Sequence, residues 1–229
     1  MQDHIIARPC AGTSLPSQAQ FIGTGLSLLL AAGAAGAADL NEASFGDLSN
    51  DRLAPTRWVL DTVTPGPAPG VWNNVLIGKT GRSSSAGVVD RDYIHVVVPQ
   101  GQQWVALRVG NQTQSGGAGG SFIGLAAGAV MPLPSDATSA AGLLGWRHYG
   151  VADRNTDILP PMAVAVAGSS GFSVPLTAGD YTLWIQELAT GSFDYRFNLQ
   201  LSPVPEPTSA ALLALGIAAL AARRRRLAG

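Results

Sequence analysis

The stretch that decides the fold reads Tyr-Arg-Phe-Asn-Leu-Gln-Leu at residues 195–201. Apolar and polar side chains alternate along it, as in a β-strand with one face on a core and the other in water. Residues 181–185, Tyr-Thr-Leu-Trp-Ile, follow the same period, with Tyr181, Leu183 and Ile185 on one face and Trp184 on the other. These runs predict antiparallel strands packed on an apolar core.

Further runs with strand character precede these two, and turns rich in glycine and proline separate them. The predicted strands cover residues 58–62, 71–77, 92–98, 102–109, 121–130, 162–167, 172–176, 180–187 and 193–201. No amphipathic helix longer than two turns is evident in this region. Many short strands at regular spacing predict an all-β fold, a single β-sandwich or jelly-roll domain.

Composition limits what the chain can do. Of 229 residues only 13% are charged, and the formal net charge of −1 argues against a nucleic-acid partner. Cys10 is the single cysteine, which excludes an intramolecular disulfide and a cysteine-based metal cage. Residues 39–202, the predicted domain, hold 13 Asp and Glu against 9 Lys and Arg and are mildly acidic.

The N-terminal region has the features of an export signal. Residues 21–35 form an apolar run, and the small residues Gly36, Ala37 and Ala38 follow it. Small side chains before a polar start fit a signal peptidase, so residues 1–38 are predicted to be a leader and signal peptide. The alternative is a buried Ala/Leu helix within the domain.

The C-terminal region, residues 203–229, is predicted to be a sorting and anchor segment. Pro205-Glu206-Pro207 breaks the preceding strand, and residues 208–222 are uniformly apolar or small. As a helix this run would span about 22 Å, slightly short of a hydrocarbon core of about 30 Å. The arginines at 223–226 would hold its end on the cytoplasmic side.

This tail resembles the PEP-CTERM sorting signal of exopolysaccharide-producing Gram-negative bacteria. The residues that carry the resemblance are Pro205, Glu206, Pro207, Arg223, Arg224, Arg225 and Arg226. The resemblance implies processing by an exosortase, a membrane cysteine protease. It also implies export, transient anchoring in the inner membrane, and then residence at the cell surface or in the extracellular matrix. Members of this family share the tail and differ in their central domains, so the activity stays open.

Two fragments of the central domain look like elements of bacterial pre-peptidase C-terminal-like β-sandwiches. Residues 90–101 read Asp-Arg-Asp-Tyr-Ile-His-Val-Val-Val-Pro-Gln-Gly, and residues 178–183 read Ala-Gly-Asp-Tyr-Thr-Leu. The resemblance implies a jelly-roll accessory domain, a class in which some members bind polysaccharide or calcium.

No catalytic residue is predicted, and the protein is expected not to be an enzyme. His95 lies within a predicted strand, where a solvent-facing or hydrogen-bonded histidine is the ordinary case. His148 lies beside Trp146 and Tyr149, which leaves a loop site for a glycan-active hydrolase or esterase as an alternative.

A calcium ion is the one cofactor that the residues suggest. Asp153, Asn155 and Asp157 space oxygen ligands at alternate positions, as at the start of a calcium loop. Ile158 and Val164 stand where an EF-hand needs its glycine and glutamate, so a solvated turn is the alternative.

Aromatic side chains offer the remaining candidate contacts, because aromatic faces pack on the apolar faces of sugar rings. Trp146, Tyr149 and Trp184 are the candidate stacking residues, with packing in the core as the alternative for each. We therefore expect a structural or adhesive protein with weak exopolysaccharide association. A calcium-dependent carbohydrate-binding module is the alternative.

Overall fold

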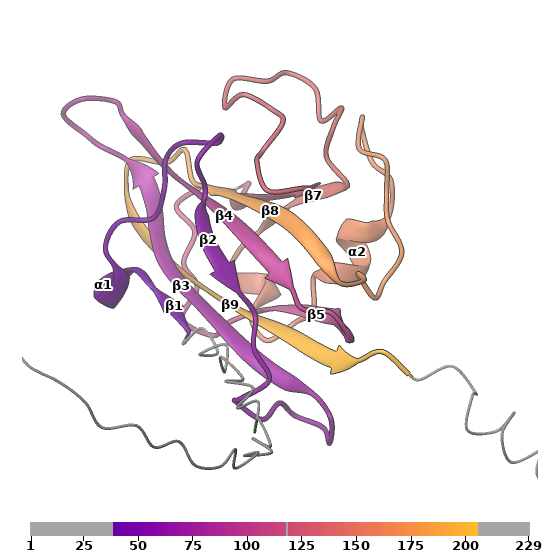
Figure 1. Cartoon of the computed structure of the whole chain (residues 1–229). Helices are drawn as coiled ribbons and strands as arrows, with labels where there is room; N and C mark the ends of the chain where they lie inside the picture. The colour runs from indigo at the N-terminus through magenta and orange to yellow at the C-terminus, as the bar shows by residue number, and fades with distance from the viewer. Residues whose placement is uncertain (1–38, 118, 206–229) are drawn as a thin grey trace, which may run out of the picture. The chain divides into compact units, whose positions relative to one another are not determined.

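The computed structural model describes residues 39–117 and 119–205, which form a β-rich domain (Figure 1). Its strands are β1 (Leu40–Asn41), β2 (Thr56–Val59), β3 (Trp72–Arg82), β4 (Val89–Val98), β5 (Gln102–Val109), β6 (Ser121–Ala127), β7 (Gly145–Tyr149), β8 (Gly179–Gln186) and β9 (Gly191–Pro203). Its helices are short: α1 (Glu42–Phe45), a 3-10 turn (Val151–Asp153) and α2 (Leu159–Ala163).

The strands follow the order β5-β9-β3-β4-β8-β6-β7, with β1 added in parallel to β3 and β2 in parallel to β4. Strands β3 and β4 pair only at their hairpin, where Gly81 and Arg82 face Asp90 and Val89. The sheet therefore curls there into two layers, sheet A (β1, β3, β9, β5) and sheet B (β2, β4, β8, β6, β7). The predicted all-β class is confirmed.

One apolar core lies between the two layers. The inward residues of β9, from Tyr195 to Leu201 at every second position, are buried, as are Tyr181, Leu183 and Ile185 of β8. Both alternating runs thus point inward as their sequences predict. The outward residue Gln200 is also buried, at 6% exposure, because β9 lies between β5 and β3 in sheet A.

A buried hydrogen bond connects the two layers inside the core. The hydroxyl of Tyr195, on β9, donates to Oδ2 of Asp92, on β4, over 2.6 Å. Gly78 of β3 makes room for this contact, because a Cβ there would overlap the Tyr195 hydroxyl. Asp92 is fully buried, and its Oδ1 has no hydrogen-bond partner among the described residues.

Two predicted strands are not observed, and two observed strands, β1 and β7, are not among the predicted ones. Residues 162–167 are not a strand: Leu159–Ala163 form α2, because Pro160 and Pro161 open it and proline favours the first turn of a helix. Residues 172–176 are irregular apart from one bridge between Leu176 and Trp104. By contrast, β7 is a strand where the sequence, with Arg147 and His148 in place of alternating apolar residues, suggests a loop.

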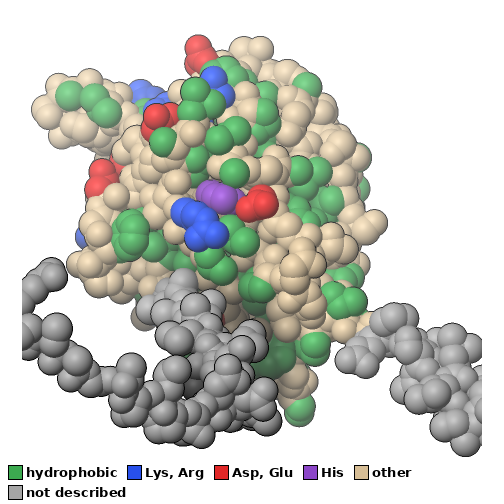
Figure 2. All heavy atoms as spheres, in the orientation of Figure 1, with side chains coloured by type: hydrophobic (Ala, Val, Ile, Leu, Met, Phe, Trp, Pro, Cys, Tyr) green, Lys and Arg blue, Asp and Glu red, His purple; other side chains and the backbone are tan. Residues whose placement is uncertain are grey.

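The surface is poor in charge, as the composition requires. Figure 2 shows one face on which hydrophobic and uncharged atoms dominate and charged side chains are scattered. Among the described residues there is one arginine–carboxylate ion pair, Arg147 with Asp153, and one close histidine–carboxylate contact, His95 with Asp180.

Within residues 39–117 and 119–205, no helix is long and apolar enough to cross a membrane. The predicted leader, residues 1–38, and the predicted apolar helix, residues 208–222, lie outside the described residues. The predicted domain boundaries therefore stay predictions.

Candidate functional site: an aromatic pocket on sheet B

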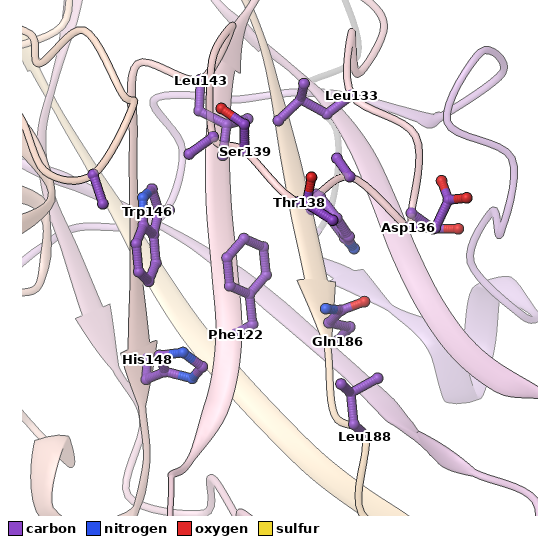
Figure 3. A pocket seen from close by; sticks show the side chains of 15 residues that line it. Phe122, Leu133, Asp136, Thr138, Ser139, Leu143, Trp146, His148, Gln186 and Leu188 are labelled. Atoms are coloured by element: carbon purple, nitrogen blue, oxygen red, sulfur yellow. The ribbon is translucent and has the colours of Figure 1, made fainter.

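A pocket of about 420 Å³ lies on the outer face of sheet B. Its lining comes from strands β6, β7 and β8 and from the chain between β6 and β7, residues 128–144, together with Ala167 and Leu188. We call this chain segment the β6–β7 loop. Figure 3 shows the labelled side chains that surround the pocket.

A glycine lies between the two tryptophans that line the pocket. Gly124 of β6 pairs with Trp146 of β7 on one side and with Trp184 of β8 on the other. A Cβ at Gly124 would lie 3.1 Å from the ring of Phe122 and 3.3 Å from Leu143. The missing side chain therefore leaves the space that Phe122 occupies between the two indoles.

Phe122 is the centre of an aromatic cluster. Its ring centroid lies 6.0 Å from that of Trp146 in a stacked arrangement and 4.9 Å from that of Trp184 in an edge-to-face arrangement. His148 lies 6.2 Å from Phe122, also edge to face. Figure 3 shows Trp146 and His148 on one side of Phe122 and Gln186 with Leu188 on the other. Aromatic packing of this kind fixes the rings and makes a preformed apolar surface.

The β6–β7 loop forms the opposite wall, and both of its ends are anchored. Met131 is fully buried, and its backbone exchanges two hydrogen bonds with Arg52, at 2.9 and 3.0 Å. Leu143 is 2% exposed in the same cluster as Tyr93. Between these anchors the loop presents exposed polar side chains to the pocket, namely Ser135, Asp136, Thr138 and Ser139.

Polar groups are also present beside the aromatic rings. The indole Nε1 atoms of Trp146 and Trp184 are buried and have no hydrogen-bond partner among the described residues. Gln186 accepts a bond from Nε of Arg91 over 3.1 Å, which fixes its oxygen and leaves its NH₂ as a donor. The pocket thus combines apolar ring faces with donors and acceptors.

Two of the three predicted stacking residues meet in this pocket. Trp146 and Trp184 both line it, although Trp184 is only 5% exposed because the β6–β7 loop covers it. Tyr149 does not line this pocket: it is 1% exposed and packs edge to face on Phe197 in the core, which is the alternative given for it above. Tyr149 alternates with His148 along β7, so it points to the opposite face of the sheet.

The predicted calcium ligands lie in the turn after β7, outside this pocket. Asp153 accepts hydrogen bonds from Arg147 and from the backbone N–H of Gly150. Oδ1 of Asp157 accepts from two backbone N–H groups, while Asn155 has a left-handed φ of 63°. No group of three or more His, Cys, Asp or Glu among the described residues is placed to hold a metal ion. Calcium binding there stays a prediction.

The two histidines of the domain lie apart. Nε2 of His95 is 2.7 Å from Oδ1 of Asp180, and His95 does not line the pocket. His148 is exposed at the pocket edge, and Asp136 is the one carboxyl group among the lining residues. Sequence alone did not indicate Phe122, Gly124 or the β6–β7 loop, because their meeting depends on the pairing of β6 with β7 and β8.

Strand β9 leads directly to the predicted sorting motif. The backbone N–H of Val204 donates to the carbonyl of Gly101 over 2.9 Å, and the exposed Pro205 follows. The remaining predicted sorting residues lie outside the described residues: Glu206, Pro207, Arg223, Arg224, Arg225 and Arg226.

Together these features define an all-β domain with an aromatic surface pocket and a C-terminal tail that begins where the last strand ends. Residues 203–226 match the family model described as the PEP-CTERM protein-sorting motif. The chain is therefore an exosortase-sorted extracellular protein, exported and sorted to the cell surface or the extracellular space. No curated protein and no solved structure matches the chain. The resemblance to pre-peptidase C-terminal-like sandwiches stays a prediction.

Proposed function

We propose that this exported protein is a non-enzymatic binding module with a structural or adhesive role. Its ligand is a neutral polysaccharide, which binds in the aromatic pocket on sheet B. No cofactor takes part in the binding.

The observation that carries the proposal is the pairing of ring faces with polar groups in one preformed pocket. Phe122 and Trp146 supply apolar faces, and Gln186, Ser139 and Thr138 lie around them (Figure 3). A sugar ring has an apolar face and a hydroxylated rim, so it needs both kinds of contact at once. The low charge of the lining favours a neutral sugar over an ionic one.

Calorimetric titration of the purified full chain with maltohexaose and cellohexaose tests the proposal. We expect binding of at least one of the two, with quenching of tryptophan fluorescence. Trp146→Ala should weaken it at least about tenfold, because removal of a central aromatic anchor commonly has an effect of this size. EDTA should leave the affinity unchanged.

Phe45→Ala is the matched control, because Phe45 is 61% exposed on α1 and does not line the pocket. It should bind as the unaltered chain does. Equal loss in both variants, or no binding of either oligosaccharide, would contradict the proposal. Dependence on calcium would instead favour the turn that holds Asp153.

A further inference from the structure

A second pocket, of about 530 Å³, lies on the outer face of sheet A. Its floor is built by Asn73 of β3, Asn198 and Gln200 of β9, and Arg108 of β5. This pocket lies on the opposite layer of the sandwich from the proposed neutral-sugar site. Neither that site nor the sorting motif gives it a function.

The strand register explains how these side chains come together. Gln200 pairs with Asn73 on one side and with the small Ala106 on the other. Two residues earlier on β9, Asn198 pairs directly with Arg108. Residues 198 and 200 share a face of the strand, so the amides and the guanidinium form one continuous polar surface.

The walls of this pocket are preformed. On one side the chain runs through Pro65, Gly66 and Pro67, where Gly66 donates its N–H to the carbonyl of Val71 over 2.7 Å. A Cβ at Gly66 would be 2.7 Å from the Val71 side chain, so the turn is closely packed. The other wall ends at Asn155. A ligand would therefore meet a surface that needs little ordering on binding.

Much of the hydrogen-bonding capacity of the floor is unused. Nη1 of Arg108 donates to the carbonyl of Asn155 over 3.3 Å, while its Nε is buried and has no partner among the described residues. Nε2 of Gln200 donates to Oδ1 of Asn73 over 3.1 Å. No hydrogen bond between described residues involves the side-chain amide of Asn198. The open groups are thus amide donors and acceptors beside one guanidinium.

The one charge in the lining of this pocket is positive. Arg108 is the one charged residue in the lining, and it belongs neither to the Arg147–Asp153 ion pair nor to the His95–Asp180 contact of the described residues. The nearby carboxyl of Asp157 is directed to the backbone N–H groups of Leu107 and Leu159. An arginine without an acidic partner favours a carboxylate, which its planar fork can bind through two N–H groups.

We propose that this pocket binds a carboxylate-bearing sugar, a uronic acid residue of an acidic polysaccharide. Arg108 binds the carboxylate, and the amides of Asn73, Asn198 and Gln200 bind the ring hydroxyls. This inference is independent of the neutral-sugar site, because the two pockets lie on opposite layers and share no lining residue.

Titration of the purified full chain with trigalacturonate, at low salt, tests the inference, with maltotriose and sodium sulfate as parallel ligands. We expect trigalacturonate to bind and Arg108→Gln to weaken it at least about tenfold, as expected for loss of a charge-assisted contact. Arg108→Lys keeps the positive charge without the planar guanidinium, so its affinity for trigalacturonate should lie between those of the unaltered chain and Arg108→Gln. Sulfate at equal concentration should not displace trigalacturonate.

Two further variants separate the site from general effects. Asn198→Asp places a carboxylate opposite Arg108 and should block binding while leaving the guanidinium in place. Arg57→Gln makes the same change of charge on an exposed residue of β2, in sheet B, and should leave the affinity unchanged. Melting temperatures of all variants report whether they fold.

Four outcomes would overturn the inference: no binding of trigalacturonate, equal loss in Arg57→Gln, full displacement by sulfate, or maltotriose binding abolished by the same Arg108 variant. Each of these outcomes can be distinguished from failure of the neutral-sugar proposal, because that proposal is tested by the effect of Trp146→Ala on the binding of maltohexaose and cellohexaose.

Discussion

Asp92 shows what burial does to one ionisable residue in this domain. Burial raises its pKa to about 8, the bond from Tyr195 opposes the rise, and the charges of Asp90, Glu42 and Asp47 add to it. The carboxyl group is therefore largely protonated at neutral pH when the protein is folded. In the unfolded chain an aspartate has its ordinary pKa of about 3.9.

Stability should therefore fall as the pH rises from about 4 to about 8. Between these values the folded protein holds a proton on Asp92 that the unfolded chain releases. The contribution of this proton to stability is therefore complete below the pKa of the unfolded chain, and it is lost as the pH rises through the pKa of the folded protein. The slope from this group is at most about 1.4 kcal/mol per pH unit. Urea unfolding at pH 5 and pH 8 measures it.

Asp92→Asn should remove most of this slope, because the amide keeps an acceptor for Tyr195 and does not titrate. Asp136→Asn, on the exposed β6–β7 loop, should keep the slope of the unaltered chain. An unchanged pH dependence in Asp92→Asn would show that other groups cause it.

For single residues, the sequence predicts burial where apolar and polar side chains alternate along a strand. Tyr195 and Leu183 follow a strict period of two, so their burial could be inferred. Trp184 was expected on the outward face and lies there, but the loop that covers it comes from residues 128–144 and has no local signal. Tyr149 lies in a strand whose polar residues conceal the period, and its inward direction was missed.

At the scale of the elements, the close packing of strand β7 on helix α2 depends on a glycine. Gly145 opens β7 against α2, and a Cβ there would overlap the carbonyl oxygen of Met162. Met162 is itself fully buried, so the helix cannot move away without opening the core. The glycine therefore sets how closely the helix approaches the strand.

Gly145→Ala should destabilise the domain by about 1–3 kcal/mol, the usual cost of forcing an added group into a packed site. The denaturant midpoint measures this loss. Gly119→Ala is the control, since a Cβ there meets no atom within 4 Å, and it should change the midpoint little. Equal stability of the two variants would mean that α2 moves freely.

The elements themselves were predicted with uneven success, for physical reasons. Strands β8 and β9 have residues whose propensity and period agree, so the sequence identifies both. The apolar stretch at 162–167 has strand-like composition, but two prolines upstream start a helix that ends at Ala163. For a short apolar run, the neighbouring residues decide between helix and strand.

At the scale of the whole molecule, the two proposed binding pockets and the C-terminal sorting tail lie on different parts of the chain. The aromatic pocket is built on β6, β7 and β8 and the amide-rich pocket on β3, β5 and β9, so one chain presents different surfaces on its two layers. The tail begins after Pro203, at the end of β9. Processing there can remove residues beyond 203 without removing a lining residue of either pocket.

The C-terminal tail should decide whether the protein stays in the membrane. In native-host cells that lack the exosortase, the full chain should stay in the membrane fraction, because residues 208–222 are apolar and the arginines at 223–226 oppose translocation. In cells with the enzyme, intact-mass measurement should show loss of the tail. A truncation that lacks residues 204–229 should leave the membrane fraction in both strains. Retention of the truncated chain in the envelope would show that another part of the protein holds it there.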